Sequence, residues 1–188
     1  MIYSKKTRVM VDAMIDRLGG LEGVKRYLDG EITMVEVYKK VSNFISSTFK
    51  VIIYEKLTLE ELAKKGKFGW ITGNFDDRYF SEVIKAKQKH KKKIAIFHFN
   101  KKMLSPAIIA EMNRVGFRPA TPRELLCLAI TKPDLHRLFP VVALGYICNI
   151  RRIQLVVCIC ERFGRSNLSF RHYIRCWPVG YRFAAVQI

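Results

Sequence analysis

The stretch GFRPATPRELL, residues 116–126, carries the sharpest local signal in this chain. Thr121 is followed three residues later by Glu124, and such a pair satisfies the first backbone N–H groups of a helix from both sides. Pro122 suits the first helical position, where its missing N–H is not needed. The pattern therefore predicts a helix over 122–130 that is entered from a short connector at 116–120.

The segments on either side of this helix predict a mixed α+β fold. Residues 93–99 alternate like a strand and carry apolar side chains on both faces, so we expect this strand in the middle of a sheet. Ser105 and Pro106 predict the N-cap and first position of a helix that runs to Arg114. The elements expected downstream are a short helix over 134–138, a strand over 141–145 and a strand-rich end that closes at 181–186.

The first half of the chain predicts helices followed by a connecting segment. Apolar spacing indicates helices, and an apolar β-branched run indicates a strand before a helix that begins near Thr58. The helices are expected over 7–18, 21–28 and 33–46, and the strands over 49–54 and 68–72. We therefore divide the chain into a helical N-terminal region (1–48), an α/β connecting segment with a basic run (49–93) and a C-terminal domain (94–188).

Composition places the chain among folded basic proteins. Its 188 residues include 34 Lys or Arg against 16 Asp or Glu, a formal net charge of +18, and 49% are hydrophobic, which is enough to build a core. All lysines lie at or before Lys132, whereas residues 133–188 use arginine alone. No apolar run reaches about 18 residues, the length of a membrane-spanning helix, and the N-terminus has no apolar signal core. We expect a cytoplasmic protein without a membrane span, and the oligomeric state stays open.

Motifs for catalysis, metals or cofactors are weak. The sequence has no Gly-rich phosphate loop, no HExxH, no G-x-S-x-G and no C-x-x-C pair. Cys158 and Cys160 are spaced as C-x-C, with His172 as the nearest imidazole, and this spacing is unusual for zinc. We expect neither enzymatic activity nor a cofactor or metal. The rival hypothesis of a cysteine- or metal-dependent enzyme requires these three side chains to converge.

Several segments of the last third resemble, as an ordered set, one group of bacterial proteins. They are FHFN at 97–100, GFRPATPRELL at 116–126, FPVVALG at 139–145, Trp177 and RFAAV at 182–186. The set is similar to the variable proteins of diversity-generating retroelements, which have a C-type-lectin-like fold of the formylglycine-generating-enzyme type. The resemblance implies a C-type-lectin-like C-terminal domain, preceded here by the small helical region, that displays a diversified ligand-binding surface. The active-site cysteine pair of the formylglycine-generating enzymes has no counterpart, so their activity is not implied.

Residue usage after position 146 agrees with such diversification. In these systems template adenines are copied with errors, so that AAY codons become NNY codons, which cannot encode Lys, Glu, Gln, Met or Trp. These five types fill 36 of the first 132 residues, a share that corresponds to about eight in the 31 residues 146–176. Two occur there, Gln154 and Glu161.

The resemblance places the ligand-binding surface around residues 146–181, and we expect its ligand to be a protein. Arginine and aromatic side chains on a packed scaffold supply binding energy of this kind. Alternation predicts that Leu168 and Phe170 face the core while Asn167 and Ser169 face solvent. The candidate ligand-binding residues are Tyr146, Cys148, Asn149, Arg152, Arg162, Phe163, Arg165, Asn167, Ser169, Arg171, His172, Tyr173, Arg175, Val179 and Tyr181.

A basic nucleic-acid-binding or mobile-element accessory protein is the alternative function. Lysine and arginine gain affinity for phosphate chains by releasing counterions, and residues 85–93 hold six lysines. The same run also fits an ordinary solvated linker, which is the interpretation that we favour. The candidate phosphate contacts are Lys85, Lys87, Lys89, Lys91, Lys92 and Lys93.

Overall fold

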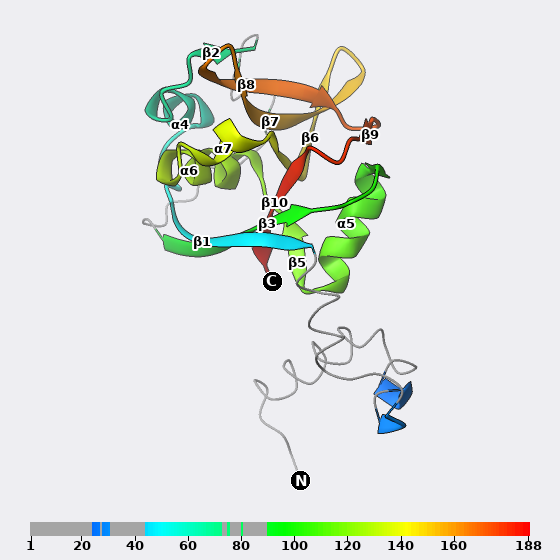
Figure 1. Cartoon of the computed structure of the whole chain (residues 1–188). Coiled ribbons are helices and arrows are strands. Elements are labelled where there is room, and N and C mark those ends of the chain that lie inside the picture. The colour runs from blue at the N-terminus through cyan, green and yellow to red at the C-terminus, as the bar shows by residue number, and fades with distance from the viewer. Residues whose placement is uncertain (1–23, 27, 31–43, 73–74, 76–79, 81–89) are drawn as a thin grey trace.

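One mixed sheet organises the part of the chain that the structure describes. The computed structural model describes residues 24–26, 28–30, 44–72, 75, 80 and 90–188. In the sheet the strand order is β1-β3-β10-β6-β7-β8-β2, and β5 also pairs with β10 (Figure 1). A separate two-stranded sheet joins β4 to β9. The strands are β1 (Ile45–Ile53), β2 (Trp70–Ile71), β3 (His90–His98), β4 (Met103–Leu104), β5 (Phe117–Pro119), β6 (Val141–Ile150), β7 (Ile153–Arg162), β8 (Arg165–His172), β9 (Cys176–Trp177) and β10 (Arg182–Gln187).

Helices cover both faces of this sheet. They are α4 (Leu59–Lys65), α5 (Ser105–Arg114), α6 (Pro122–Thr131) and α7 (Leu135–Leu138). The side chains of α4 and α6 pack in one core cluster with Ile94 and Ile96 of β3, and α5 packs in the other with Ala95 and Phe97. The expectation of a central strand with two apolar faces is therefore confirmed. None of the helices in the described ranges is long and apolar enough to cross a membrane.

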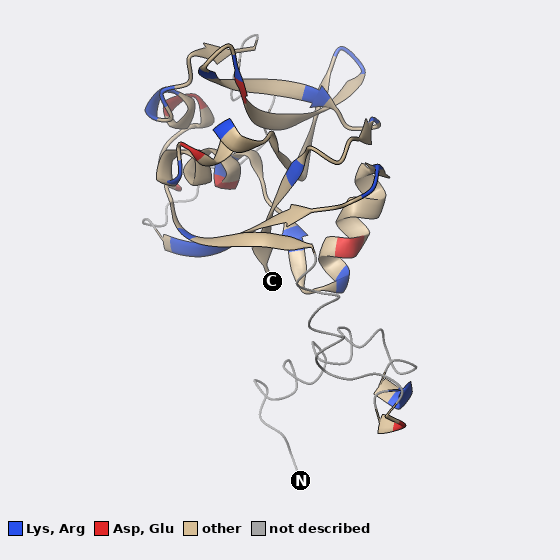
Figure 2. Cartoon of the chain, in the orientation of Figure 1, with Lys and Arg blue, Asp and Glu red and all other residues tan. Residues whose placement is uncertain are grey.

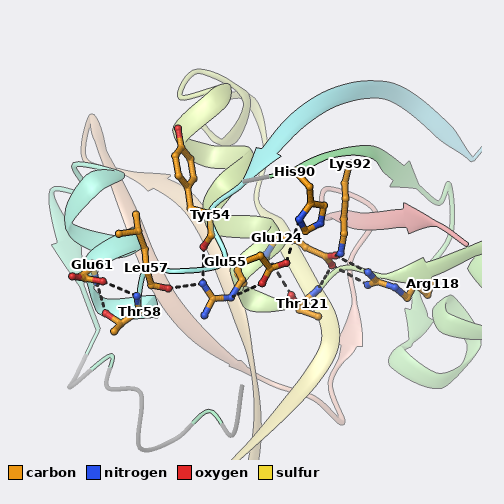
Figure 3. A network of polar contacts seen from close by, with 11 residues as sticks. Tyr54, Glu55, Leu57, Thr58, Glu61, His90, Lys92, Arg118, Thr121 and Glu124 are labelled. Carbon is orange, nitrogen blue, oxygen red and sulfur yellow. Dashed lines mark hydrogen bonds and ion pairs between the residues drawn. The ribbon is translucent and has the colours of Figure 1, made fainter. Parts of the chain in front are cut away.

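The stretch 116–126 is the polar junction of the fold (Figure 3). The predicted capping box is present, because Thr121 Oγ1 and Glu124 each accept a backbone N–H of the other. Glu124 also accepts from Lys92 Nζ at 2.8 Å and from both terminal nitrogens of Arg118 at 2.6 and 2.9 Å. The buried guanidinium of Arg123 donates to the backbone carbonyls at the end of β1 and before α4. The segment thus ties β3, β5, α6 and the β1–α4 connection together.

Burial and charge act against each other at Glu124. The side chain is 1% exposed, and burial alone raises the pKa of this carboxyl. The hydrogen bonds from Arg118 and Lys92 outweigh burial and lower the pKa below its ordinary value of 4.5. The carboxylate is therefore the charged anchor of the junction.

Gly145 marks the closest backbone approach beside this junction. Its N–H donates to the carbonyl of Ala120 at 2.9 Å. A Cβ placed on this residue would lie 2.6 Å from the carbonyl oxygen of Pro119, inside the contact distance of any side chain. The register of β6 against β7 also shifts between Ala143 and Cys148, around this glycine. Only glycine lets β6 pass here without displacing the chain.

Several sequence-based boundaries are wrong. The helix expected over 33–46 would include Ile45 and Ser46, but β1 begins at Ile45, because it pairs with β3 and Ser46 Oγ donates to Ile96 O at 3.2 Å. The boundary expected between 93 and 94 falls inside β3, and β1 and α4 share their core with the C-terminal part. Of the helix expected over 21–28, residues 24–26 and 28 are helical; the helix over 7–18 lies outside the described residues.

Ser105 is not the N-cap that its sequence position predicted. The N-cap of α5 is Leu104, which makes no side-chain capping bond. Ser105 is instead fully buried, donates to the carbonyl of Tyr173 and accepts from Trp177 Nε1 at 2.8 Å. The hydroxyl of Ser105 therefore makes tertiary hydrogen bonds instead of a helix cap. These bonds hold the segment after β8 against the start of α5.

Candidate functional site

Two tight hairpins carry most of the candidate ligand-binding residues. Ile150 pairs with Ile153, so that residues 151–152 form the loop between β6 and β7. Arg162 pairs with Arg165, so that residues 163–164 form the loop between β7 and β8. Because both loops flank β7, the two tips lie at opposite ends of that strand (Figure 1). The predicted surface is therefore not one compact patch.

Both hairpin tips hold non-glycine residues in the left-handed conformation. Arg151 and Arg152 have φ of 48° and 68°, and Phe163 has φ of 54° before Gly164 at 72°. Two-residue hairpin loops with positive φ at both positions strongly prefer Asn, Asp and Gly. Arg151, Arg152 and Phe163 are exposed, Phe163 by 89%, so no burial compensates for the backbone strain.

A cationic and aromatic cluster lies on the segment that follows β8. The guanidinium of Arg175 lies 5.1 Å from the ring centroids of both Trp177 and Tyr181, between a buried and a half-buried ring. Tyr181 Oη accepts from Arg175 at 3.5 Å, and Arg171 donates to Cys160 Sγ at 3.9 Å. These contacts bring Arg171, Arg175 and Tyr181 of the predicted set to one face of β7 and β8.

Cys158 and Cys160 lie on this same face but do not form the metal site of the rival hypothesis. A hydrogen bond from Cys158, together with the charge of Arg171, lowers the pKa of Cys160 to about 6 despite burial. The same hydrogen bond and burial raise the pKa of Cys158. His172 projects to the other face of the sheet, two residues after Phe170, which packs on the opposite core. The three side chains therefore do not converge, and the described residues contain no group of three His, Cys, Asp or Glu that could hold a metal.

A groove of about 480 Å³ opens at the β7–β8 tip. It is lined by Gly69, Trp70, Arg162, Phe163, Arg165 and Asn167. The wall formed by Trp70 comes from β2, which pairs in parallel with β8 through Trp70 opposite Asn167. Gly69 is required here, because a Cβ would lie 2.8 Å from Cβ of Arg165.

Three candidate residues are buried, which corrects the prediction that their side chains are exposed to solvent; of the three, Asn167 still lines the groove. Asn167 and Ser169 do point away from Leu168, as alternation predicted, but their face is covered. Ser169 Oγ donates to Cys158 O at 3.3 Å, and Asn167 Nδ2 donates to Arg162 O at 3.4 Å. Cys148 is 1% exposed and belongs to the core. Strand alternation assigns each side chain to one face of the sheet, but it does not show whether the face opposite the core is itself buried.

The other candidate residues differ in how far they reach solvent. Tyr146 is half-buried and packs on the ring of Phe80 at 5.7 Å between centroids, so it supports the core. Tyr173 is also half-buried and packs beside the core cluster of Trp177. The exposed candidates are Asn149, Arg152, Arg162, Phe163, Arg165, His172 and Val179, and the half-buried ones are Arg171, Arg175 and Tyr181.

The lysines proposed as phosphate contacts are only partly described. Lys85, Lys87 and Lys89 lie outside the described residues. Lys91 and Lys93 are exposed on β3. Lys92 is not free for a phosphate, since its ammonium pairs with the buried Glu124.

Charge along the described strands is unevenly distributed. Figure 2 shows acidic residues on α4, α5 and α6, and the hairpins β6–β7 and β7–β8 carry basic residues at their tips with one acid, Glu161, near the β7–β8 turn. Residues 146–181 hold six arginines and one acid, Glu161. Glu161 accepts the N–H of Gly164 at 3.2 Å within its own turn. No ion pair joins any of these arginines to a carboxylate of the described residues.

Sequence reasoning missed two residues of this region, Trp70 and Arg151. Trp70 is 55% exposed and lies almost a hundred positions before β8, so only the parallel β2–β8 pairing brings it into the groove. Arg151 lay inside the expected window, but arginine is not one of the residues that mark a tight turn, so nothing in the sequence singled it out. Comparison of this chain with family models, curated proteins and solved structures found no match in any of the three.

Proposed function

We propose that this chain is a ligand-binding protein with a C-type-lectin-like C-terminal domain, whose surface around residues 146–181 is diversified by a retroelement and binds a protein ligand. It acts by binding and not by catalysis. The exposed arginines and aromatic residues of the hairpins form the binding surface, and the two core clusters form its constant support.

The hairpin tips carry this proposal. A loop selected for folding would place Asn or Gly where φ is positive, yet this chain has Arg151, Arg152 and Phe163 there. Each such residue costs about 1–2 kcal/mol of backbone strain. Backbone strain at exposed residues, which no burial compensates, is typical of residues kept for function. Arg and Phe both belong to the NNY codon set, and Asn is the residue that an AAY template codon specifies.

The element order supports the fold assignment. The helix α6 begins at the predicted capping box, the antiparallel strands β6, β7 and β8 follow it, and β10 returns to pair with β3. The same order of helix start, strand-rich end and closing strand characterises the resemblance described above. Because β10 lies between β3 and β6, the strand next to the hairpins is paired on both sides. The hairpins therefore extend from the middle of the sheet.

The test is to sequence the gene with several kilobases of flanking DNA. We expect an imperfect repeat of the codons for residues 146–181, with mismatches confined to template adenines, beside a reverse-transcriptase gene. We further expect AAY codons in the template at positions 151, 152 and 163. The absence of a repeat, or mismatches spread over all four bases, would refute diversification.

A further inference from the structure

We infer that the groove between Trp70 and Phe163 binds a carboxylate next to an apolar side chain in an acidic peptide segment, with Trp70 as a constant contact outside the diversified region. This inference rests on the proposed ligand-binding function and names the chemistry of one subsite. Its elements are the indole wall of Trp70, the phenyl wall of Phe163 and two cations that pair with no carboxylate of the described residues.

The two walls are unusually exposed aromatic rings. Trp70 is 55% and Phe163 89% exposed, whereas the other tryptophan, Trp177, is 1% exposed and fully packed. Exposed aromatic rings that flank a groove bury large apolar area when a partner binds. A groove of about 480 Å³ accommodates a few side chains of such a partner.

The two cations lie directly opposite each other. Arg162 and Arg165 form a cross-strand pair, and like charges in that position repel. The guanidinium of Arg162 also lies 5.4 Å from the ring centroid of Phe163. Neither arginine has a carboxylate of the described residues within ion-pair distance. A carboxylate bound between them would relieve this repulsion and accept the paired N–H donors of a guanidinium.

The arrangement favours an acidic peptide over a nucleic acid. A phosphate chain requires a continuous track of cations. The exposed lysines Lys91 and Lys93 lie on β3, next to the β1 edge of the sheet, and the groove lies at the β2 edge. The groove therefore offers one confined cationic site beside aromatic walls, which matches a single acidic side chain with an apolar neighbour.

Trp70 makes the test direct, because it is the exposed one of two tryptophans. The full chain is titrated with an acetylated hexapeptide of alternating Glu and Phe, and acrylamide quenching of tryptophan fluorescence is measured. We expect the acidic peptide to protect Trp70 saturably, and the peptide with Gln in place of Glu to bind at least about tenfold more weakly, which corresponds to about 1.4 kcal/mol. In Trp70→Phe the signal should vanish, since Trp177 is already shielded.

Matched variants separate a specific site from general attraction. Arg162→Gln with Arg165→Gln should weaken binding about tenfold, while Lys101→Gln with Lys102→Gln, which removes the same charge at an exposed turn, should change it less than about twofold. Equal weakening in both pairs, equal affinity for the neutral peptide, or tighter protection by an oligothymidylate with a steep salt dependence would overturn the inference. Peptide binding and the template repeat are measured independently. A failure to bind the peptide would overturn the acidic-peptide site, whereas the absence of a repeat would refute diversification.

Discussion

Replacement of Phe163 by Asn should stabilise the protein. Phe163 has φ of 54°, and a non-glycine residue in this conformation costs about 1–2 kcal/mol, most of which Asn avoids. The ring is 89% exposed, so its removal loses little burial. The cation–π contact with Arg162 at 5.4 Å is worth about 0.5 kcal/mol at such an exposed place. We therefore expect a net gain of about 1 kcal/mol in the free energy of unfolding.

Urea unfolding followed by far-UV circular dichroism measures this gain. The midpoint should rise with the slope unchanged, and the melting temperature should rise by about 3 °C for a chain of this length. Phe163→Ala is the matched control, because it removes the ring but keeps the left-handed strain, so it should show no gain. If the Asn variant is no more stable than the parent, or if the Ala variant gains as much, the backbone at Phe163 does not store this strain.

Three further perturbations address the scaffold and the cysteine pair. Glu124→Gln should lower the free energy of unfolding by about 3 kcal/mol, because Lys92 and Arg118 lose their buried partner. Urea denaturation would measure this loss. A loss below about 0.5 kcal/mol would contradict the stabilising role of Glu124. Gly145→Ala should lower the free energy of unfolding by about 2 kcal/mol through a clash with a backbone carbonyl, seen as a lower melting temperature. In a Cys176→Ser background, the ultraviolet absorbance of the thiolate should rise through pH about 6 and then level off, because the pKa of the buried Cys160 is lowered and absorbance does not require reagent access. A midpoint near that of an ordinary thiol, pH about 8.5, would contradict the hydrogen bond from its neighbouring cysteine.

Local signals in the sequence predicted the elements whose ends are determined locally. The capping boxes at Thr58 and Thr121 set the starts of α4 and α6, because both partners of each box lie within four residues. The two-faced pattern of 93–99 predicted the central strand β3. At Ser105 the same local reasoning failed, because the hydroxyl bonds to residues about seventy positions away.

The candidate site was harder to predict than the fold, because its shape depends on pairings distant in sequence. Alternation assigned Asn167 and Ser169 to the correct side of β8, but nothing in the sequence shows that this side is buried as well. Trp70 enters the groove only through a two-residue parallel pairing. The left-handed tips were equally hidden, because Arg and Phe give no turn signal of their own.

The short strand β2 also has a consequence for solubility. Without it, β8 would be the last strand of the sheet, and its unpaired N–H and C=O groups would be open to strands of other molecules. Gly69 N and Thr72 N bond instead to the carbonyls of Ser166 and Leu168, at 2.8 and 2.9 Å. Because these bonds involve backbone atoms alone, they form whatever side chains β8 carries. Substitutions along β8, such as the proposed diversification would introduce, would therefore leave this protection against edge-to-edge aggregation intact.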